Sequence, residues 1–122
     1  MEYTIMNENE RVIMAAHGYL ELGMFRQVWE ELQTLPAELL GRSDVIEILV
    51  LSLMGEKRWD EALKLAQHLR SEMPGEPSGF IHEAFCLHEL GRTREALELL
   101  LEGPPVLRGK AIFFYNAGCY HA

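Results

Sequence analysis

The chain has 122 residues, of which 48% are hydrophobic and 25% charged, and this composition excludes a disordered chain or a disulfide-rich scaffold. Eleven Lys and Arg against nineteen Asp and Glu give a net charge of −8, which disfavours nucleic acid and anionic membranes as partners. With two cysteines, no secretory leader pattern and no apolar run near the roughly 20 residues that cross a bilayer, we expect a cytoplasmic protein.

Helical spacing of apolar residues, interrupted by glycine and proline, predicts a chain made only of helices. Asn7 and Glu10 resemble a capping box that opens the first helix, and Ser43 and Ser78 are available as later N-caps. In chain order we expect helices over residues 8–22, 25–35, 43–54, 59–72, 78–90, 93–102 and 110–122.

The turns inside each pair of helices are predicted from glycine, and the breaks between pairs from proline. Gly23, Gly55 and Gly91 each stand where a C-terminal glycine lets one helix stop and the next begin. Pro36 and Pro104 come early, so the second helices of the first and third pairs should be short.

An internal repeat of 34 residues organises these helices. Five columns separated by this step keep an apolar residue: Val12, Ile46, Phe80 and Phe114; Ala16, Val50, Ala84 and Gly118; Val28, Ala62 and Ala96; Trp29, Leu63 and Leu97; Leu32, Ala66 and Leu100. Both tryptophans, Trp29 and Trp59, are accordingly expected to be buried. A period of this length predicts stacked helical hairpins.

The repeat resembles that of the tetratricopeptide repeat family, most closely in the stretch R-W-D-E-A-L-K-L-A that ends at Pro74. The resemblance implies an all-α fold, a right-handed α-solenoid of helix-turn-helix hairpins with about three units plus one extra C-terminal helix. We expect a single domain over 1–122, with units at about 9–42, 43–76 and 77–110 and a partial fourth unit over 111–122.

In such an array the first helices line a concave groove that binds partners. The residues expected there are Ile13, His17, Leu20, Glu47, Leu51, Met54, Ile81, Phe85, His88, Tyr115, Asn116 and Cys119. Glu10, Glu21, Asp44 and Glu89 would form acidic edges, which suits an extended or amphipathic segment with hydrophobic anchors between basic residues. The alternative is that some of these side chains pack between the first helices as core.

No catalytic motif or phosphate-binding loop is found in the sequence, so we expect neither an enzyme nor a cofactor. His82, Cys86 and Glu89 share one helical stripe, but three ligands on one helix without a fourth make a weak metal site, and we expect no metal.

The leading interpretation is a protein-interaction scaffold or adaptor that holds a peptide or helix of a partner in the groove. Alternatives are a small escort chaperone of a secretion system and a module that assembles with itself. The apolar segment F-Y-N-A-G-C-Y near the C-terminus lacks a second helix to cover it, which suggests an array stopped within a hairpin and homodimers formed through this helix.

Overall fold

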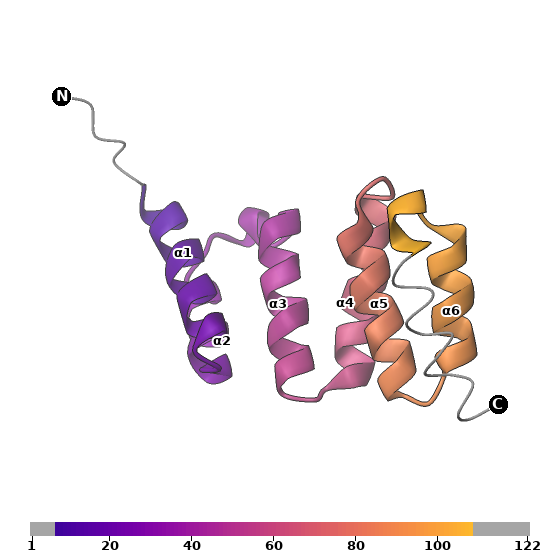
Figure 1. Ribbon diagram of the computed structural model, residues 1–122. Helices are drawn as coiled ribbons and strands as arrows, with labels where there is room; N and C mark the ends of the chain where they lie inside the picture. Colours follow the sequence, from indigo (N-terminus) through magenta and orange to yellow (C-terminus); the bar gives the residue numbers. More distant parts are fainter. Residues whose placement is uncertain (1–6, 109–122) are drawn as a thin grey trace.

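The computed structural model describes residues 7–108, and over this range the chain forms six α-helices and two short 3₁₀ turns, with no strand. The helices are α1 (Glu8–Glu21), α2 (Phe25–Leu32), α3 (Ser43–Gly55), α4 (Trp59–Glu72), α5 (Pro77–Glu89) and α6 (Thr93–Glu102). The 3₁₀ turns are η1 (Ala37–Leu39) and η2 (Pro105–Leu107). Sequential hairpins stand in a row from α1 to α6 (Figure 1). The all-α hairpin architecture is therefore confirmed.

The helix ends largely follow the sequence signals. The Asn7 side chain accepts a hydrogen bond of 2.8 Å from the backbone N–H of Glu10, as an N-cap should. The capping box is only half formed, because the Glu10 carboxylate turns to Arg42. The expected N-caps Ser43 and Ser78 are wrong: both lie inside their helices, which are preceded by Arg42 and Glu76.

Two of the second helices are short, as the early prolines predict. α2 has 8 residues and α6 has 10, against 14 in α4. α2 also ends earlier than expected, at Leu32, and the chain passes through Pro36 into η1 before α3 begins.

The same tight turn closes the first helix of every hairpin, but glycine makes it in only two of them. Gly23 and Gly91 have φ of 73° and 82°, and in the second hairpin Lys57 has φ of 60°. These three residues are 34 apart, and each donates its N–H to a carbonyl three residues earlier, at 2.9–3.0 Å. The expectation that Gly55 makes this turn is wrong. Gly55 ends α3 and lies so close to the Phe25 ring that a Cβ there would overlap it.

The core largely follows the 34-residue columns, although Val12 and Leu97 are only partly buried and Trp29 departs from its column. Ala16, Val50 and Ala84 are fully buried, and the columns of Val28 and Leu32 are buried in all three hairpins. Trp59, which was expected to be buried, is partly buried and packs against the core cluster of the last two hairpins. Trp29 does not follow its column: it is 54% exposed, whereas Leu63 in the same column is 7% exposed. The predicted burial of Trp29 is therefore wrong.

The hairpins do not pack on one another equally. α5 lies against α4 along its length, and a Cβ on Gly79 would stand 2.8 Å from the backbone of Arg70. The Arg70 guanidinium caps this interface with a 2.6 Å bond to the buried Glu83 carboxylate and lies over the Phe80 ring. The equivalent contact of α2 with α3 is much less extensive. The first hairpin is thus joined more loosely to the array than the third.

No helix within residues 7–108 is long and apolar enough to cross a membrane. The expected helix at 110–122 and the partial fourth unit at 111–122 lie outside the described residues, as does the homodimer contact expected there.

Candidate functional site

A hollow of about 580 Å³ opens between the first helices of the first two hairpins. We call it the α1–α3 hollow; its lining residues are Glu10, Ile13, Met14, His17, Asp44, Glu47, Ile48 and Leu51. The helical spacing of Ile13 and His17 on α1, and of Glu47 and Leu51 on α3, points these four side chains to the same opening. They are four of the residues predicted from the sequence to line a groove.

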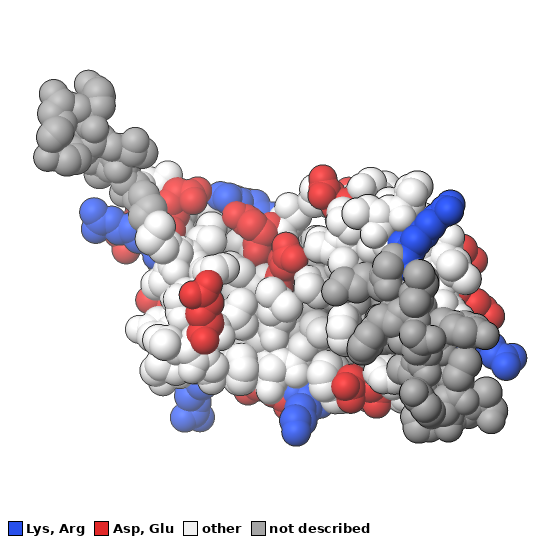
Figure 2. Space-filling model, viewed as in Figure 1, with Lys and Arg blue, Asp and Glu red and all other residues white. Residues whose placement is uncertain are grey.

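The floor of the hollow is apolar and its edge is charged. Ile13 and Ile48 are buried, Leu51 is half-buried, and Met14 is 61% exposed. Figure 2 shows carboxylates over α1 and α3 around an uncharged area, with most Lys and Arg side chains toward the periphery of this face. A contiguous apolar floor with a polar edge is a usual form of protein-binding surface.

Arg42 joins the two helices at the edge of the hollow. Its guanidinium donates hydrogen bonds to Asp44 at 2.8 and 3.1 Å and to Glu10 at 3.2 Å. These bonds, first that to Asp44 and then that to Glu10, raise the pKa of Arg42 above its ordinary value. Two of the predicted acidic edge residues are therefore partly neutralised, an interaction that the sequence analysis missed because Arg42 and Glu10 are 32 residues apart.

Two histidines lie at or next to the α1–α3 hollow: His17 lines it, and His82 contacts the lining residue Glu47. The Nε2 atom of His82 on α5 lies 3.0 Å from the Glu47 carboxylate, so this pair connects the first helices of the second and third hairpins. His17 is exposed, and its Nδ1 atom lies 3.5 Å from the Glu21 carboxylate on the same helix. Glu47 is therefore held in place from α5.

The other predicted groove residues do not line this hollow. Leu20, Met54, Ile81 and Phe85 pack against the core clusters, as the alternative interpretation allowed. His88 makes a 2.8 Å hydrogen bond with the Thr93 hydroxyl at the start of α6. Tyr115, Asn116 and Cys119 lie outside the described residues.

Two lining residues, Met14 and Ile48, were absent from the predicted groove. They are 34 residues apart and so occupy the same column of successive repeats. The sequence signal for this pair is the apolar residue at both positions, one helical step from Ile13 and from Glu47.

The stripe of His82, Cys86 and Glu89 does not form a ligand set. His82 is bonded to Glu47, Cys86 is fully buried, and no group of three or more His, Cys, Asp or Glu among residues 7–108 is placed to hold a metal. Burial, and then the nearby Glu83 and Glu89 charges, raise the pKa of the Cys86 thiol to about 11. Cys86 is therefore a neutral core side chain near pH 7.

A family model described as tetratricopeptide repeat matches residues 53–112, from the last turns of α3 through α6. No curated protein and no solved structure matches the chain significantly. Repeats of this family generally mediate protein–protein interactions and are typically not catalytic. The hairpins, the buried 34-residue columns and this match agree in identifying tetratricopeptide repeats within residues 53–112, the part of the chain that the family model matches.

Proposed function

We propose that the protein is an interaction scaffold or adaptor that holds a short segment of a partner protein in the α1–α3 hollow. The observation that carries the proposal is the exposed Met14 beside the half-buried Leu51, at the mouth of an otherwise buried apolar floor. An exposed methionine of this kind adapts its shape to an apolar side chain from a partner.

The charges around the floor favour a segment with basic residues on both sides of its apolar anchor. Glu10, Asp44 and Glu47 contribute three carboxylates, and Arg42 compensates only part of that charge. Basic flanking residues would gain from electrostatic complementarity, which raises the association rate and helps to exclude acidic partners.

We also propose the division of the chain into units at about 9–42, 43–76 and 77–110, each holding one of the three hairpins. In this scheme the hollow lies between the first helices of the first and second units. An adaptor and a secretion escort chaperone would use the same surface and differ in whether the bound protein is exported.

The test is capture of partners with immobilised wild-type protein and with the Met14→Glu, Leu51→Glu double variant. Phe85, another residue predicted to line the groove, is not substituted because it packs against the core. We expect the amount of captured protein to fall at least about tenfold, since the bound segment would cover the new carboxylates and leave them without a partner. Circular dichroism should show unchanged helicity.

The matched control is Leu101→Glu, which changes another exposed apolar residue (63% exposed) on α6, away from the hollow. It should capture as the wild type does. Equal capture by the double variant and the wild type would contradict the proposal, and identification of the captured protein distinguishes an adaptor from an escort.

A further inference from the structure

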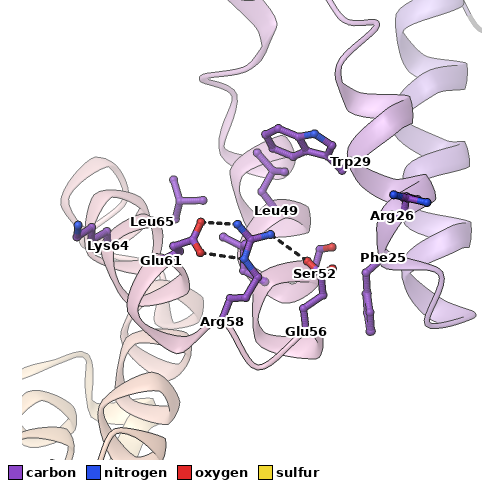
Figure 3. Close-up of a pocket in the computed structure, with 11 residues that line it drawn as sticks. Phe25, Arg26, Trp29, Leu49, Ser52, Glu56, Arg58, Glu61, Lys64 and Leu65 are labelled. Atoms are coloured by element: carbon purple, nitrogen blue, oxygen red, sulfur yellow. Dashed lines mark hydrogen bonds and ion pairs between the residues drawn. The ribbon is translucent and has the colours of Figure 1, made fainter.

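A second hollow, of about 600 Å³, opens between α2, α3 and α4, on a different face of α3 from the first. We call it the α2–α4 hollow. Its apolar part includes Trp29, Leu49 and Leu65, and its cationic side chains are Arg26, Arg58 and Lys64 (Figure 3). Its lining residues come from α2, from the second half of α3 with the turn that follows it, and from the first half of α4.

Trp29 is the residue in this hollow that the fold does not explain. In the second hairpin the equivalent side chain, Leu63, is buried, but the Trp29 side chain is 54% exposed. A half-exposed indole offers a large rigid apolar surface at low entropic cost, and tryptophan is enriched among residues that dominate binding energy.

The three cationic side chains of the hollow differ in whether they are paired with carboxylates of the protein. Arg58 makes two hydrogen bonds to Glu61, at 2.6 and 2.8 Å, and one to Glu56 at 3.3 Å, so its charge is balanced by two carboxylates. Within residues 7–108, Arg26 makes no hydrogen bond or ion pair. Lys64 likewise makes none in that range, although its charge acts on Glu61 at a distance.

Arg26 and Lys64 lie on opposite sides of the hollow, with Arg58 between them (Figure 3). Two cations that make no hydrogen bond or ion pair within residues 7–108, one on either side of an apolar surface, are complementary to an apolar side chain with a carboxylate on each side. The chain as a whole has a net charge of −8, so the positive charge at this hollow contrasts with most of the surface. An acidic segment would be repelled from the rest of the surface and attracted to the hollow.

We propose that the α2–α4 hollow binds a short acidic segment of a second partner protein, with an aliphatic or aromatic side chain placed on Trp29 and its carboxylates at Arg26 and Lys64. The two hollows then accept segments of opposite charge on different faces of the array. The protein would thereby bring two different proteins together.

The test begins with selection of a displayed library of random heptapeptides on the full chain. The enriched peptides should place Asp or Glu on both sides of Leu, Phe or Trp. A fluorescein-labelled peptide of the enriched sequence is then titrated by anisotropy. Its affinity should fall with added salt and drop about tenfold or more in Trp29→Ala and in the Arg26→Glu, Lys64→Glu double variant.

The matched control is the Arg11→Glu, Arg94→Glu double variant, which makes the same change in net charge at two exposed arginines outside the hollow. It should keep most of the affinity, and so should Met14→Glu, which alters only the first hollow. Retained binding by Met14→Glu separates this proposal from the function proposed above, so that either can fail alone.

The proposal is overturned by no enrichment, by enrichment of peptides without acidic residues, or by equal binding of the enriched peptide by the Trp29→Ala protein. Sedimentation of the wild type and of Trp29→Ala completes the test. A dimer that depends on Trp29 would show that a second copy fills the hollow, and would also overturn the proposal.

Discussion

At the scale of single residues, Lys57 has a backbone conformation that favours glycine. The residue has φ of 60°, in the left-handed region where a side chain costs about 1 kcal/mol or more, whereas the equivalent positions in the other hairpins are glycines. The turn keeps its hydrogen bonds, from Lys57 to Met54 and from Arg58 to Leu53, each 2.9 Å. The strain is local and the rest of the hairpin compensates for it.

Replacing Lys57 with glycine should therefore stabilise the protein by about 0.5–1 kcal/mol, the relief of strain less the added freedom of the unfolded chain. Urea unfolding followed by circular dichroism measures this change. The reverse substitution, Gly91→Lys, should destabilise by a similar amount. A Lys57→Gly protein no more stable than the wild type would show that this backbone conformation is not strained.

The Cys86 thiol should be unreactive in the folded protein. With its pKa raised to about 11 by burial, only about one thiol in a thousand is ionised at pH 8. In a Cys119→Ser background, Ellman's reagent should label Cys86 at pH 8 only after guanidinium is added. Rapid stoichiometric labelling of the folded protein would contradict its burial.

The same shift has a consequence for stability against pH. The pKa of the thiol is higher in the folded than in the unfolded protein. The thiol's contribution to the free energy of unfolding is therefore complete below its pKa in the unfolded chain, near 8.5, and is lost as pH rises toward 11. The Cys86→Ala protein should not show this particular alkaline loss.

At the scale of helices, two glycines within helices differ in whether a neighbouring helix packs against them. Gly79 lets α5 approach α4 so closely that a Cβ would stand 2.8 Å from the Arg70 backbone, whereas a Cβ on Gly18 in α1 would meet nothing within 4 Å. The distinction depends on where a neighbouring helix lies, and hydrophobic spacing along the chain does not contain it.

Gly79→Ala should accordingly destabilise the protein by roughly 1–3 kcal/mol, because α5 must move away from α4 and weaken the contact of Arg70 with Glu83. Gly18→Ala is the matched control and should stabilise by about 0.5–1 kcal/mol through helix propensity alone. Thermal melts of the two variants should shift in opposite directions. A shift in the same direction would refute the close approach of the two helices.

The helices themselves were largely predictable because their signals are local. The capping Asn7, the apolar spacing and the breakers place every described helix within a few residues of its expected bounds. Gly55 was expected to make the second turn because it is the nearest glycine, whereas the 34-residue step from Gly23 and Gly91 leads to Lys57. The exposure of Trp29 could not be predicted, because the repeat pattern places it in the column of the buried Leu63 and does not say which helix covers each side chain.

At the scale of the whole molecule, the array is uneven. The α4–α5 contact is extensive and capped by the bond of Arg70 to the buried Glu83, while α2 meets α3 over a smaller surface. Stability in stacked repeats is approximately the sum of unit and neighbour terms, so the weaker contact sets where the array opens first.

Native-state hydrogen exchange should therefore show the backbone amides of α1 and α2 opening at a lower free energy than those of α4 and α5. The measurement is the exchange rate of each amide against low concentrations of denaturant. One common opening free energy for all helices would mean that the hairpins unfold as a single cooperative unit.

The groove was predicted only in part. The 34-residue step brings Ile13, His17, Glu47 and Leu51 together, as expected. Of the predicted residues of the third hairpin, Ile81 and Phe85 pack against the core, and His88 forms a hydrogen bond with Thr93.

The central claim, that the α1–α3 hollow holds a segment of a partner, is tested most directly by site-specific photocrosslinking in the cell that makes the protein. The photoreactive residue p-benzoylphenylalanine is placed at Met14, 61% exposed in the hollow, or at Leu101, 63% exposed on α6. We expect a discrete crosslinked protein from position 14, abolished by Leu51→Glu, and no crosslinked protein from position 101. No crosslink at position 14, or the same product from both positions, would contradict it.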